Sequence, residues 1–243
     1  MRSLVIGASS GLGRSLSYAL AMNKHDLILV SSDKRDLIPL SKHLSYLYKV
    51  KVQYIEVDAA NFNFFKKNFF KKLLEHKNLK YVFFPMGISF NDDDIRISSD
   101  RVDKLIKVNF ETIVLVCNFI LTNSAFSELQ TIVGFGSIAT TRARKNNIIY
   151  TASKSALKSY FQSLKHAFAD KINIQFYLPG YLFSQQSMYK KLLFKPASSD
   201  KFAELVIKNL NKNFEFKYFP LYWFFISILI KIIPWRVFKK INF

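Results

Sequence analysis

The sequence predicts an α/β fold with a doubly wound parallel sheet, followed by an apolar C-terminal helical tail. Three observations predict it: 243 residues of which 50% are hydrophobic, six apolar runs of strand length, and longer amphipathic segments between those runs. A chain of this length and composition can bury one sizeable core. Strands that alternate with helices form βαβ units, and buried parallel strands read as continuous apolar runs.

The predicted strands lie at residues 3–6, 27–30, 52–57, 81–84, 131–135 and 172–177. We find no internal repeat and no linker rich in Pro or Gly, so residues 1–215 are predicted to form one domain. Residues 216–243 are predicted to form a separate segment that is apolar and has a basic rim.

Composition narrows the classes of function. A net charge of +19 favours anionic partners, but the charge is spread, without a block of five like charges, and Lys, Asn, Ile and Phe are abundant together. We therefore predict no nucleic-acid partner. Cys117 is the single cysteine, and no signal peptide precedes the first strand, so we expect a reducing, cytoplasmic environment.

A glycine-rich turn follows the first predicted strand. It reads Gly7-Ala8-Ser9-Ser10-Gly11-Leu12-Gly13, and residues 14–21 after it have helical character. Glycines let the backbone turn sharply and approach a pyrophosphate, while unpaired N–H groups at a helix start attract its charge. Three glycines alone can be a simple turn, but their place at the head of the first βα unit predicts a dinucleotide site.

A second motif, Tyr150-Thr151-Ala152-Ser153-Lys154, opens a helix that we predict over residues 152–168. Residues four positions apart share a helix face. An ammonium one turn from a phenol stabilises the phenolate and lowers a phenol pKa of about 10 toward the range of a general acid or base. The pair therefore predicts proton-transfer chemistry.

Three further features occur in the expected order. Ser137 follows the strand at 131–135, so it should emerge at the carboxyl end of the sheet, where ligands of open α/β sheets bind. Asn109 lies in a helical segment, where an amide has little reason to be buried unless it serves a hydrogen-bond network. Pro179-Gly180 follows the sixth strand and by itself predicts a turn.

With these motifs, the chain resembles the classical short-chain dehydrogenase/reductase family over roughly residues 3–185, including the G-x-x-x-G-x-G spacing of its turn. The resemblance implies a Rossmann fold and an NAD(P)(H)-dependent oxidoreductase that interconverts a ketone and a secondary alcohol. It implies that Tyr150 donates the proton, that Lys154 binds the nicotinamide ribose, that Ser137 binds the substrate oxygen and that Asn109 holds a relay water.

The resemblance also implies cofactor contacts along the carboxyl edge. Beyond Tyr150 and Lys154, these fall on the glycine turn and on Asp58, Ala59, Gly87, Pro179, Gly180 and Ser184. Pro85-Met86-Gly87 departs from the family's Asn-Ala-Gly, which removes the hydrogen bonds of that asparagine near the cofactor. No metal site is predicted.

The end of the second strand bears on the choice of cofactor. Ser31 stands where an acid would accept from the ribose 2′-OH of NAD. Ser31 and Ser32 can donate to a 2′-phosphate, and Lys34 and Arg35 are near, so NADP(H) is favoured over NAD(H). The alternative is that Lys34 and Arg35 only solvate a loop.

The tail predicts a membrane surface as partner. Its uninterrupted apolar run, residues 221–230, is half of the roughly 20 residues that a spanning helix needs. An interfacial helix fits better, because Tyr222, Trp223 and Trp235 suit the headgroup level and Lys231, Arg236, Lys239 and Lys240 suit anionic lipid. We expect peripheral attachment to the cytoplasmic face. The alternative is that the tail covers the substrate cleft or lies between subunits of a homo-oligomer.

A basic loop before Tyr150 carries Arg142 and Arg144, a pair that could hold a substrate phosphate. This loop and the tail resemble one subgroup of the family, the reductases of decaprenylphosphoryl keto-pentose. A small-molecule or lipid-linked ketone is therefore the expected substrate. The alternative from another class is a nucleotide-binding regulatory or peripheral membrane protein without turnover, which the altered residues 85–87 would fit.

Overall fold

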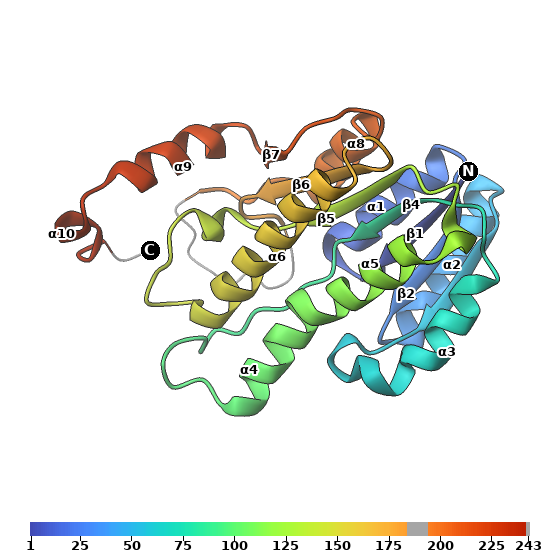
Figure 1. The fold of residues 1–243 in the computed structure, drawn as a ribbon, viewed down its shortest axis with the longest axis horizontal. Helices are drawn as coiled ribbons and strands as arrows, with labels where there is room; N and C mark the ends of the chain where they lie inside the picture. The colour runs from blue at the N-terminus through green and yellow to red at the C-terminus, as the bar shows by residue number, and fades with distance from the viewer. Residues whose placement is uncertain (184–193, 242–243) are drawn as a thin grey trace.

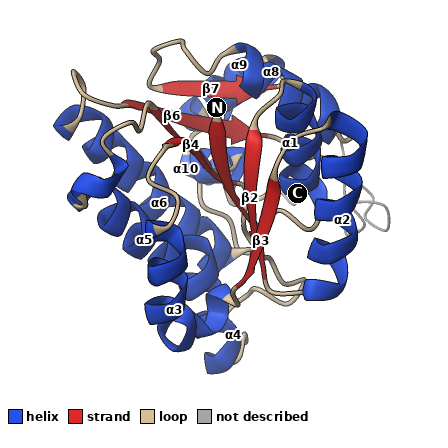
Figure 2. Cartoon of the chain, turned by 90° about the vertical axis from the view of Figure 1, so that its right-hand side faces the viewer, coloured by secondary structure: helices blue, strands red, loops and turns tan. Residues whose placement is uncertain are grey.

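The computed structural model describes residues 1–183 and 194–241, and its seven-stranded sheet carries helices on both faces (Figures 1 and 2). All strand pairs are parallel, in the order β3-β2-β1-β4-β5-β6-β7. The predicted doubly wound sheet is confirmed, with its switch point between β1 and β4. The strands are β1 (Arg2–Ile6), β2 (Asp26–Ser31), β3 (Val52–Glu56), β4 (Leu79–Phe84), β5 (Thr131–Phe135), β6 (Asn173–Pro179) and β7 (Phe216–Phe219).

Helices and short helical turns connect these strands. They are α1 (Gly11–Met22), α2 (Lys34–Tyr48), η1 (Ala59–Asn61), α3 (Phe62–Leu74), α4 (Ser99–Ile106), η2 (Lys107–Glu111), α5 (Thr112–Thr122), η3 (Ser124–Phe126), η4 (Ile138–Thr141), α6 (Ile148–Ala167), α8 (Ser199–Lys208), α9 (Tyr222–Ile232) and α10 (Trp235–Phe238). The run Ser99–Thr122 is long and apolar enough to cross a membrane. However, Ile113, Val116 and Cys117 within it are buried in the core, as in the core helix of a soluble domain.

Two apolar clusters fill the two faces of the sheet. Leu4 and Ile6 of β1 belong to the cluster beneath α3, α5 and α6, whereas Val5 between them belongs to the cluster beneath α1, α2 and α8. This alternation is what a strand covered on both faces requires. The carboxyl ends of the parallel strands share one edge, so the loops that follow β1, β4 and β5 meet there.

The seventh strand corrects the predicted boundary, which placed residues 216–219 in the tail. Phe216–Phe219 pairs with β6, with Phe216 beside Phe176 and Phe219 beside Pro179. The pattern F-K-Y-F merges without a break into the apolar tail, so periodicity alone did not separate it from that tail. The sheet therefore ends at residue 219, and the tail beyond it consists of α9 and α10.

The tail packs on the carboxyl edge of the sheet. Thr141 Oγ1 of η4 lies 3.0 Å from Ser227 Oγ of α9, within hydrogen-bond distance. Trp223 was expected at a lipid headgroup level, but it is buried and its ring contacts Tyr181 in an edge arrangement. Figure 1 shows α9 and α10, in red, at the end of the molecule opposite to the N-terminus.

Candidate active site

The glycine turn between β1 and α1 has the backbone that its sequence requires. Gly7 and Gly11 have φ angles of 100° and 47°, in the left-handed region that favours glycine. A Cβ on Gly13 would lie 1.8 Å from the carbonyl oxygen of Gly7, so no larger residue fits there. The N–H groups of Gly7 and Ala8 donate to the carbonyl of Val30 at 2.8 and 3.0 Å, which ties the turn to β2.

The start of α1 offers backbone N–H groups to an anion. Within the described part of the chain, the Ser10 side chain makes no capping hydrogen bond and the first turn of α1 has no acidic residue. A Cβ on Gly11 would meet nothing within 4 Å, so the backbone is open there, while Leu12 packs partly on the core. These features fit a pyrophosphate, because unpaired N–H groups and the helix dipole both favour negative charge.

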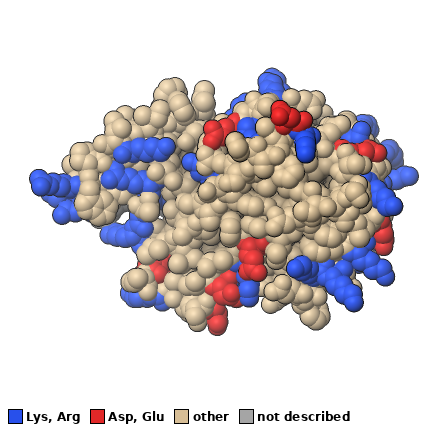
Figure 3. Space-filling model, viewed as in Figure 1, with Lys and Arg blue, Asp and Glu red and all other residues tan. Residues whose placement is uncertain are grey.

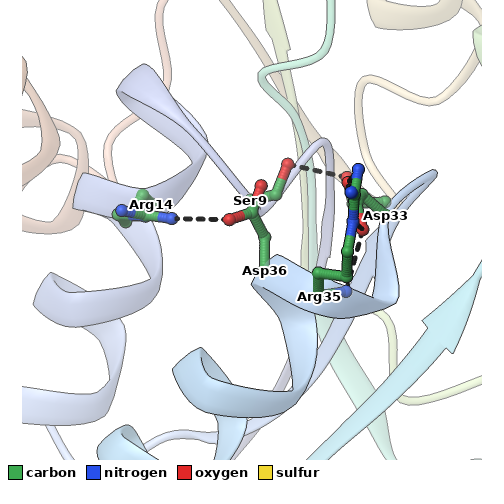
Figure 4. A network of polar contacts seen from close by, with 6 residues as sticks. Ser9, Arg14, Asp33, Arg35 and Asp36 are labelled. Carbon is green, nitrogen blue, oxygen red and sulfur yellow. Dashed lines mark hydrogen bonds and ion pairs between the residues drawn. The ribbon is translucent and has the colours of Figure 1, made fainter.

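Ser31, at the end of β2, is connected to this turn. Its hydroxyl donates to Ser9 Oγ at 2.7 Å. Near Ser9, Arg14 of α1 lies 3.6 Å from the carboxylate of Asp36 on α2 (Figure 4). Ser32 is exposed. Ser31 therefore lies beside the turn where the sequence predicts the cofactor, and Ser32 follows it in the chain.

The charged residues after Ser32 are already paired. Asp33 caps α2 and binds the guanidinium of Arg35 at 2.7 Å, and this hydrogen bonding holds the pKa of Asp33 below its usual value. Lys34 Nζ lies 2.8 Å from a carboxylate oxygen of Glu56 on β3. Carboxylates therefore balance both cations that the sequence places near the 2′-position.

Tyr150 and Ser137 meet beyond the end of β5. Helix α6 begins at Ile148 rather than at the predicted residue 152, so Tyr150 lies in its first turn. Ser137 Oγ accepts the N–H of Ala139 at 3.1 Å, and its hydroxyl lies near enough to the phenol of Tyr150 to lower the pKa of that group. Burial raises the pKa of Tyr150, and the Ser137 hydroxyl opposes part of that rise.

The ammonium of Lys154 is buried between the ends of two strands. Its Nζ donates to the carbonyl of Phe135 at 3.1 Å and to that of Met86 at 3.4 Å. Burial lowers the pKa of Lys154 to about 8, because desolvation disfavours the charged form. The sequence predicts that Lys154 lowers the pKa of Tyr150. In the structure that pKa is raised, because burial of the phenol dominates and Nζ is directed to backbone carbonyls.

Asn109 has the hydrogen-bond network that would explain a buried amide. It is fully buried in the π-helical turn η2. Its Oδ1 accepts the N–H of Ile88 at 2.8 Å, and its Nδ2 donates to the carbonyl of Ile88 at 2.9 Å and to Ser153 Oγ at 3.3 Å. Asn109 therefore fixes the loop after β4 against α6.

Gly87 lies where these groups come together. A Cβ on Gly87 would lie 3.0 Å from Lys154 Nζ and 3.3 Å from Asn109 Oδ1. Met86 packs against the glycine turn, because a Cβ on Gly7 would lie 2.8 Å from Met86 Cα. The altered segment Pro85-Met86-Gly87 therefore keeps the close approach that needs glycine and adds an apolar contact.

Arg142 is held by the tail, which differs from the predicted contact with a substrate phosphate. Its Nη1 donates to the carbonyl of Ile230 at 3.0 Å and to that of Ile233, and its guanidinium lies 4.0 Å from the centroid of the Phe238 ring. Arg142 thereby satisfies carbonyls that the end of α9 leaves unpaired and makes a cation–π contact. Arg144 is half-buried in the same loop.

The remaining predicted contacts follow β3 and β6. Asp58 caps η1 by accepting the N–H of Ala60 at 2.9 Å, which orients the Asp58-Ala59 turn. Pro179 ends β6, and a Cβ on Gly180 would lie 1.8 Å from Trp223 Nε1, so glycine there makes room for α9. Ser184 lies outside the described residues.

Asp93 is a site residue that the sequence analysis did not identify. Its carboxylate is 2% exposed and accepts the N–H groups of Ile149 at 2.9 Å and Tyr150 at 2.8 Å. The run of three acids at 92–94 is typical of a solvated loop. No local signal pointed to it, because Asn146 and Asn147 precede α6 and asparagine commonly caps a helix start.

Comparisons with known proteins agree with this geometry. The model of the short chain dehydrogenase family matches residues 2–192. The very-long-chain 3-oxoacyl-CoA reductase of Bos taurus is 22% identical over 241 residues, which are 97% of this chain and 77% of that protein. The L-xylulose reductase of Caenorhabditis elegans is 26% identical over 157 residues, 64% of this chain but 61% of that protein. A short-chain dehydrogenase from Sphingobium yanoikuyae in complex with NADPH has a TM-score of 0.78 at 18% identity, and the match covers 100% of this chain and 96% of that one.

The fold and the family match over most of the chain define an NAD(P)-dependent oxidoreductase. The chain belongs to the short-chain dehydrogenase family.

Proposed function

We propose that the protein interconverts a ketone and a secondary alcohol, with Tyr150 as acid and base, on a substrate at a membrane surface. One observation carries this proposal, the convergence of four polar side chains at the carboxyl edge. The Ser137 hydroxyl lowers the pKa of Tyr150, so the two side chains lie close together. A Cβ on Gly87 would lie 3.0 Å from Lys154 Nζ and 3.3 Å from Asn109 Oδ1.

Each of the four side chains has one role in the proposal. In the direction of reduction, Tyr150 gives its phenol proton to the carbonyl oxygen, and Ser137 donates a hydrogen bond to the same oxygen. The nicotinamide cofactor supplies hydride when it is bound. Lys154 binds the nicotinamide ribose. Asn109 holds the relay water and the loop after β4.

NADP(H) is the proposed cofactor. The hydroxyls of Ser31 and Ser32 can donate to a 2′-phosphate, and no acid stands at Ser31 to accept from a ribose 2′-OH. The solved relative from Sphingobium yanoikuyae holds NADPH. Because Lys34 and Arg35 are paired with carboxylates, hydroxyl donors rather than cations support this preference. Titration of both cofactors by fluorescence should give tighter binding of NADPH than of NADH.

The outer face of α9 supports a membrane surface as partner. Phe225, Leu229 and Ile232 of α9 are 60%, 59% and 70% exposed, and Trp235 of α10 is 65% exposed. An apolar stripe of this kind on a protein surface marks an interaction site. Basic side chains gather at the same end of the molecule (Figure 3, left) and suit anionic headgroups. The tail carries four exposed basic residues, Lys231, Arg236, Lys239 and Lys240.

The length of α9 indicates how deeply the tail would enter a membrane. Helix α9 has 11 residues, about half of what a spanning helix needs. We therefore propose a peripheral protein on the cytoplasmic face, with a lipid-linked or long-chain ketone as substrate. The basic loop that carries Arg144 supports a polyprenyl-phosphate keto-pentose, and the named relative from Bos taurus supports a long-chain 3-oxoacyl thioester.

The test is NADPH oxidation in the presence of anionic vesicles. The panel contains a polyprenyl-phosphate keto-pentose, a long-chain 3-oxoacyl-CoA and, as a water-soluble ketone, L-xylulose. We expect turnover with a lipidic ketone. Tyr150→Phe should then lower kcat by about 100- to 10,000-fold with little change in NADPH affinity, because only the proton donor is lost.

Two results would contradict the proposal. A near-normal kcat in Tyr150→Phe would show that another group moves the proton. Tight NADPH binding without turnover on any ketone would favour the alternative, a nucleotide-binding regulatory or peripheral membrane protein.

A further inference from the structure

Four consecutive N–H groups at the start of α6 are bound by one distant residue. Asp93 lies in the loop from β4 to α4, 57 positions before Tyr150. Its carboxylate accepts the N–H groups of Ile149 at 2.9 Å and of Tyr150 at 2.8 Å. Its backbone carbonyl accepts those of Asn147 at 2.6 Å and Ile148 at 3.3 Å.

The start of α6 needs such an outside cap. A helix leaves its first four N–H groups without partners, and the residue before it usually supplies a side-chain acceptor from an extended backbone. Asn147 instead has φ 59° and ψ 45°, and its side chain makes no capping hydrogen bond within the described residues. Asp93 provides the acceptors and adds negative charge at the positive end of the helix dipole.

The same loop holds two other members of the site. Ile88 binds both ends of the Asn109 amide, and the carbonyl of Met86 accepts from Lys154 Nζ at 3.4 Å. Asp93 continues this series of contacts to Tyr150. A single segment therefore sets the relative positions of three polar groups that come from η2 and α6.

The neighbouring acids of the loop have different contacts. Asp92 pairs with Arg101 of α4, and Asp94 pairs with Arg96 at 2.7 Å on the surface. Asp93 alone of the three is buried, at 2% exposure. Its neighbours therefore offer matched controls that change the same charge without touching α6.

We propose that Asp93 is a positioning residue that fixes Tyr150 for proton transfer. The proposal rests on the proposed role of Tyr150. One of the bound N–H groups belongs to Tyr150 itself, so the carboxylate fixes the main chain from which the phenol reaches Ser137. Hydrogen bonds to a carboxylate are short and strong, and a misplacement of about 1 Å at a reacting group can cost about 100-fold in rate.

The test compares Asp93→Asn with Asp94→Asn. The amide in Asp93→Asn keeps the size of the side chain but replaces one acceptor oxygen with a donor. We expect backbone amides 149 and 150 to exchange with solvent about tenfold faster or more, because hydrogen bonds to charged groups are the stronger ones. On the panel ketone that the unchanged protein reduces fastest, kcat should fall about 10- to 100-fold, with NADPH affinity and KM within about twofold. Asp94→Asn should change none of these.

Asp93→Ser keeps one hydroxyl acceptor, so its amide exchange and its kcat should lie between those of Asp93→Asn and Asp94→Asn. It replaces Asp93→Asn if that variant does not fold. The proposal is overturned if exchange and kcat match those of Asp94→Asn. It is also overturned if Tm falls while kcat per folded molecule stays the same, since that describes a cap of structural value only. If the unchanged protein reduces no ketone, the proposed function fails. The exchange of amides 149 and 150 alone then tests whether Asp93 fixes the start of α6: faster exchange in Asp93→Asn supports this role, and unchanged exchange overturns it.

Discussion

Helices α1 and α9 have similar lengths, 12 and 11 residues, but direct their side chains in opposite ways. In α1, Leu16 and Leu20 are fully buried and the Arg14 side chain is 48% exposed. In α9, Ser227 is 2% exposed whereas Leu229 is 59% exposed. A surface helix of a folded domain normally turns its apolar stripe inward. Packing in the core therefore explains the apolar face of α1 but does not explain the exposed apolar stripe on α9.

The two helices also differ in their ends. The start of α1 leaves N–H groups open beside Gly11, whereas the end of α9 is closed by Arg142. In the proposal, one helix binds a ligand at its end, and the other binds a membrane surface with its side.

The largest effect is expected at the start of α1, from Gly13→Ala. The added Cβ would lie 1.8 Å from the carbonyl oxygen of Gly7, so the turn must leave its anion-binding shape. We expect NADPH affinity to fall by about 1,000-fold, roughly 4 kcal/mol, in a fluorescence titration. Arg14→Ala, an exposed neighbour, should bind normally. Unchanged affinity in Gly13→Ala would mean that the turn does not hold the cofactor.

On the inner face of α9, Trp223→Ala should destabilise the protein by about 3–5 kcal/mol in urea unfolding, as for other buried aromatic side chains. Trp223 is 4% exposed and occupies the space above Gly180. Phe225→Ala, at a position 60% exposed, should change the free energy of unfolding by about 0.5 kcal/mol or less. Equal losses in the two variants would remove the distinction between the two faces.

Lys154, on α6, should make stability depend on pH. Its pKa is about 8 in the folded protein and 10.5 as the ordinary value, so the unfolded chain binds more protons between these limits. The free energy of unfolding should therefore rise with pH from about 8 to about 10.5, with a gain of roughly 1–3 kcal/mol from this group. Lys154→Met should lose that part of the rise. If the free energy of unfolding depends on pH in the same way in both proteins, the lowered pKa of Lys154 would be contradicted.

The smallest effect on stability is expected on the outer face of α9. Phe225→Ser combined with Leu229→Ser should change the free energy of unfolding by about 0.5 kcal/mol or less, because both side chains are exposed. Co-sedimentation with anionic vesicles should nevertheless weaken about tenfold or more, since each buried apolar side chain contributes about 1.5–3 kcal/mol. The matched control is Tyr46→Ser with Leu47→Ser on α2, at positions 77% and 52% exposed. Precipitation of the α9 variant, or loss of its NADPH binding, would favour a packed or intersubunit face.

Most of the fold could be predicted because its signals are local. The run Thr131–Phe135 is mostly apolar and is strand β5, and Gly7 and Gly11 mark a turn whose φ angles need glycine. The places of Ser137, Tyr150 and Lys154 follow from elements next to them in sequence. Strand β7 was missed because its four residues run into the apolar tail, so the contrast that marks a strand end is absent.

The contacts that could not be predicted join distant parts of the chain. Asp93 looks like its neighbours Asp92 and Asp94, and only the fold brings it under the start of α6. The sequence predicted a phosphate contact for Arg142 because the partner that it has in the structure, the end of α9, lies 88 positions later and leaves no signal near Arg142. The pKa of Tyr150 likewise depends on burial, which a four-residue spacing does not report.

The contact between α9 and η4 bears on the route by which a lipid-linked substrate would reach the active site. Turn η4 begins directly after Ser137, and Thr141 at its end binds Ser227, so the outer stripe and the catalytic side chains share one end of the molecule. With that stripe on a bilayer, a lipid-linked ketone would reach Tyr150 by lateral diffusion within the leaflet. Turnover would then follow the mole fraction of ketone among the lipids, so dilution with inert phospholipid would slow the reaction and dilution with buffer would not.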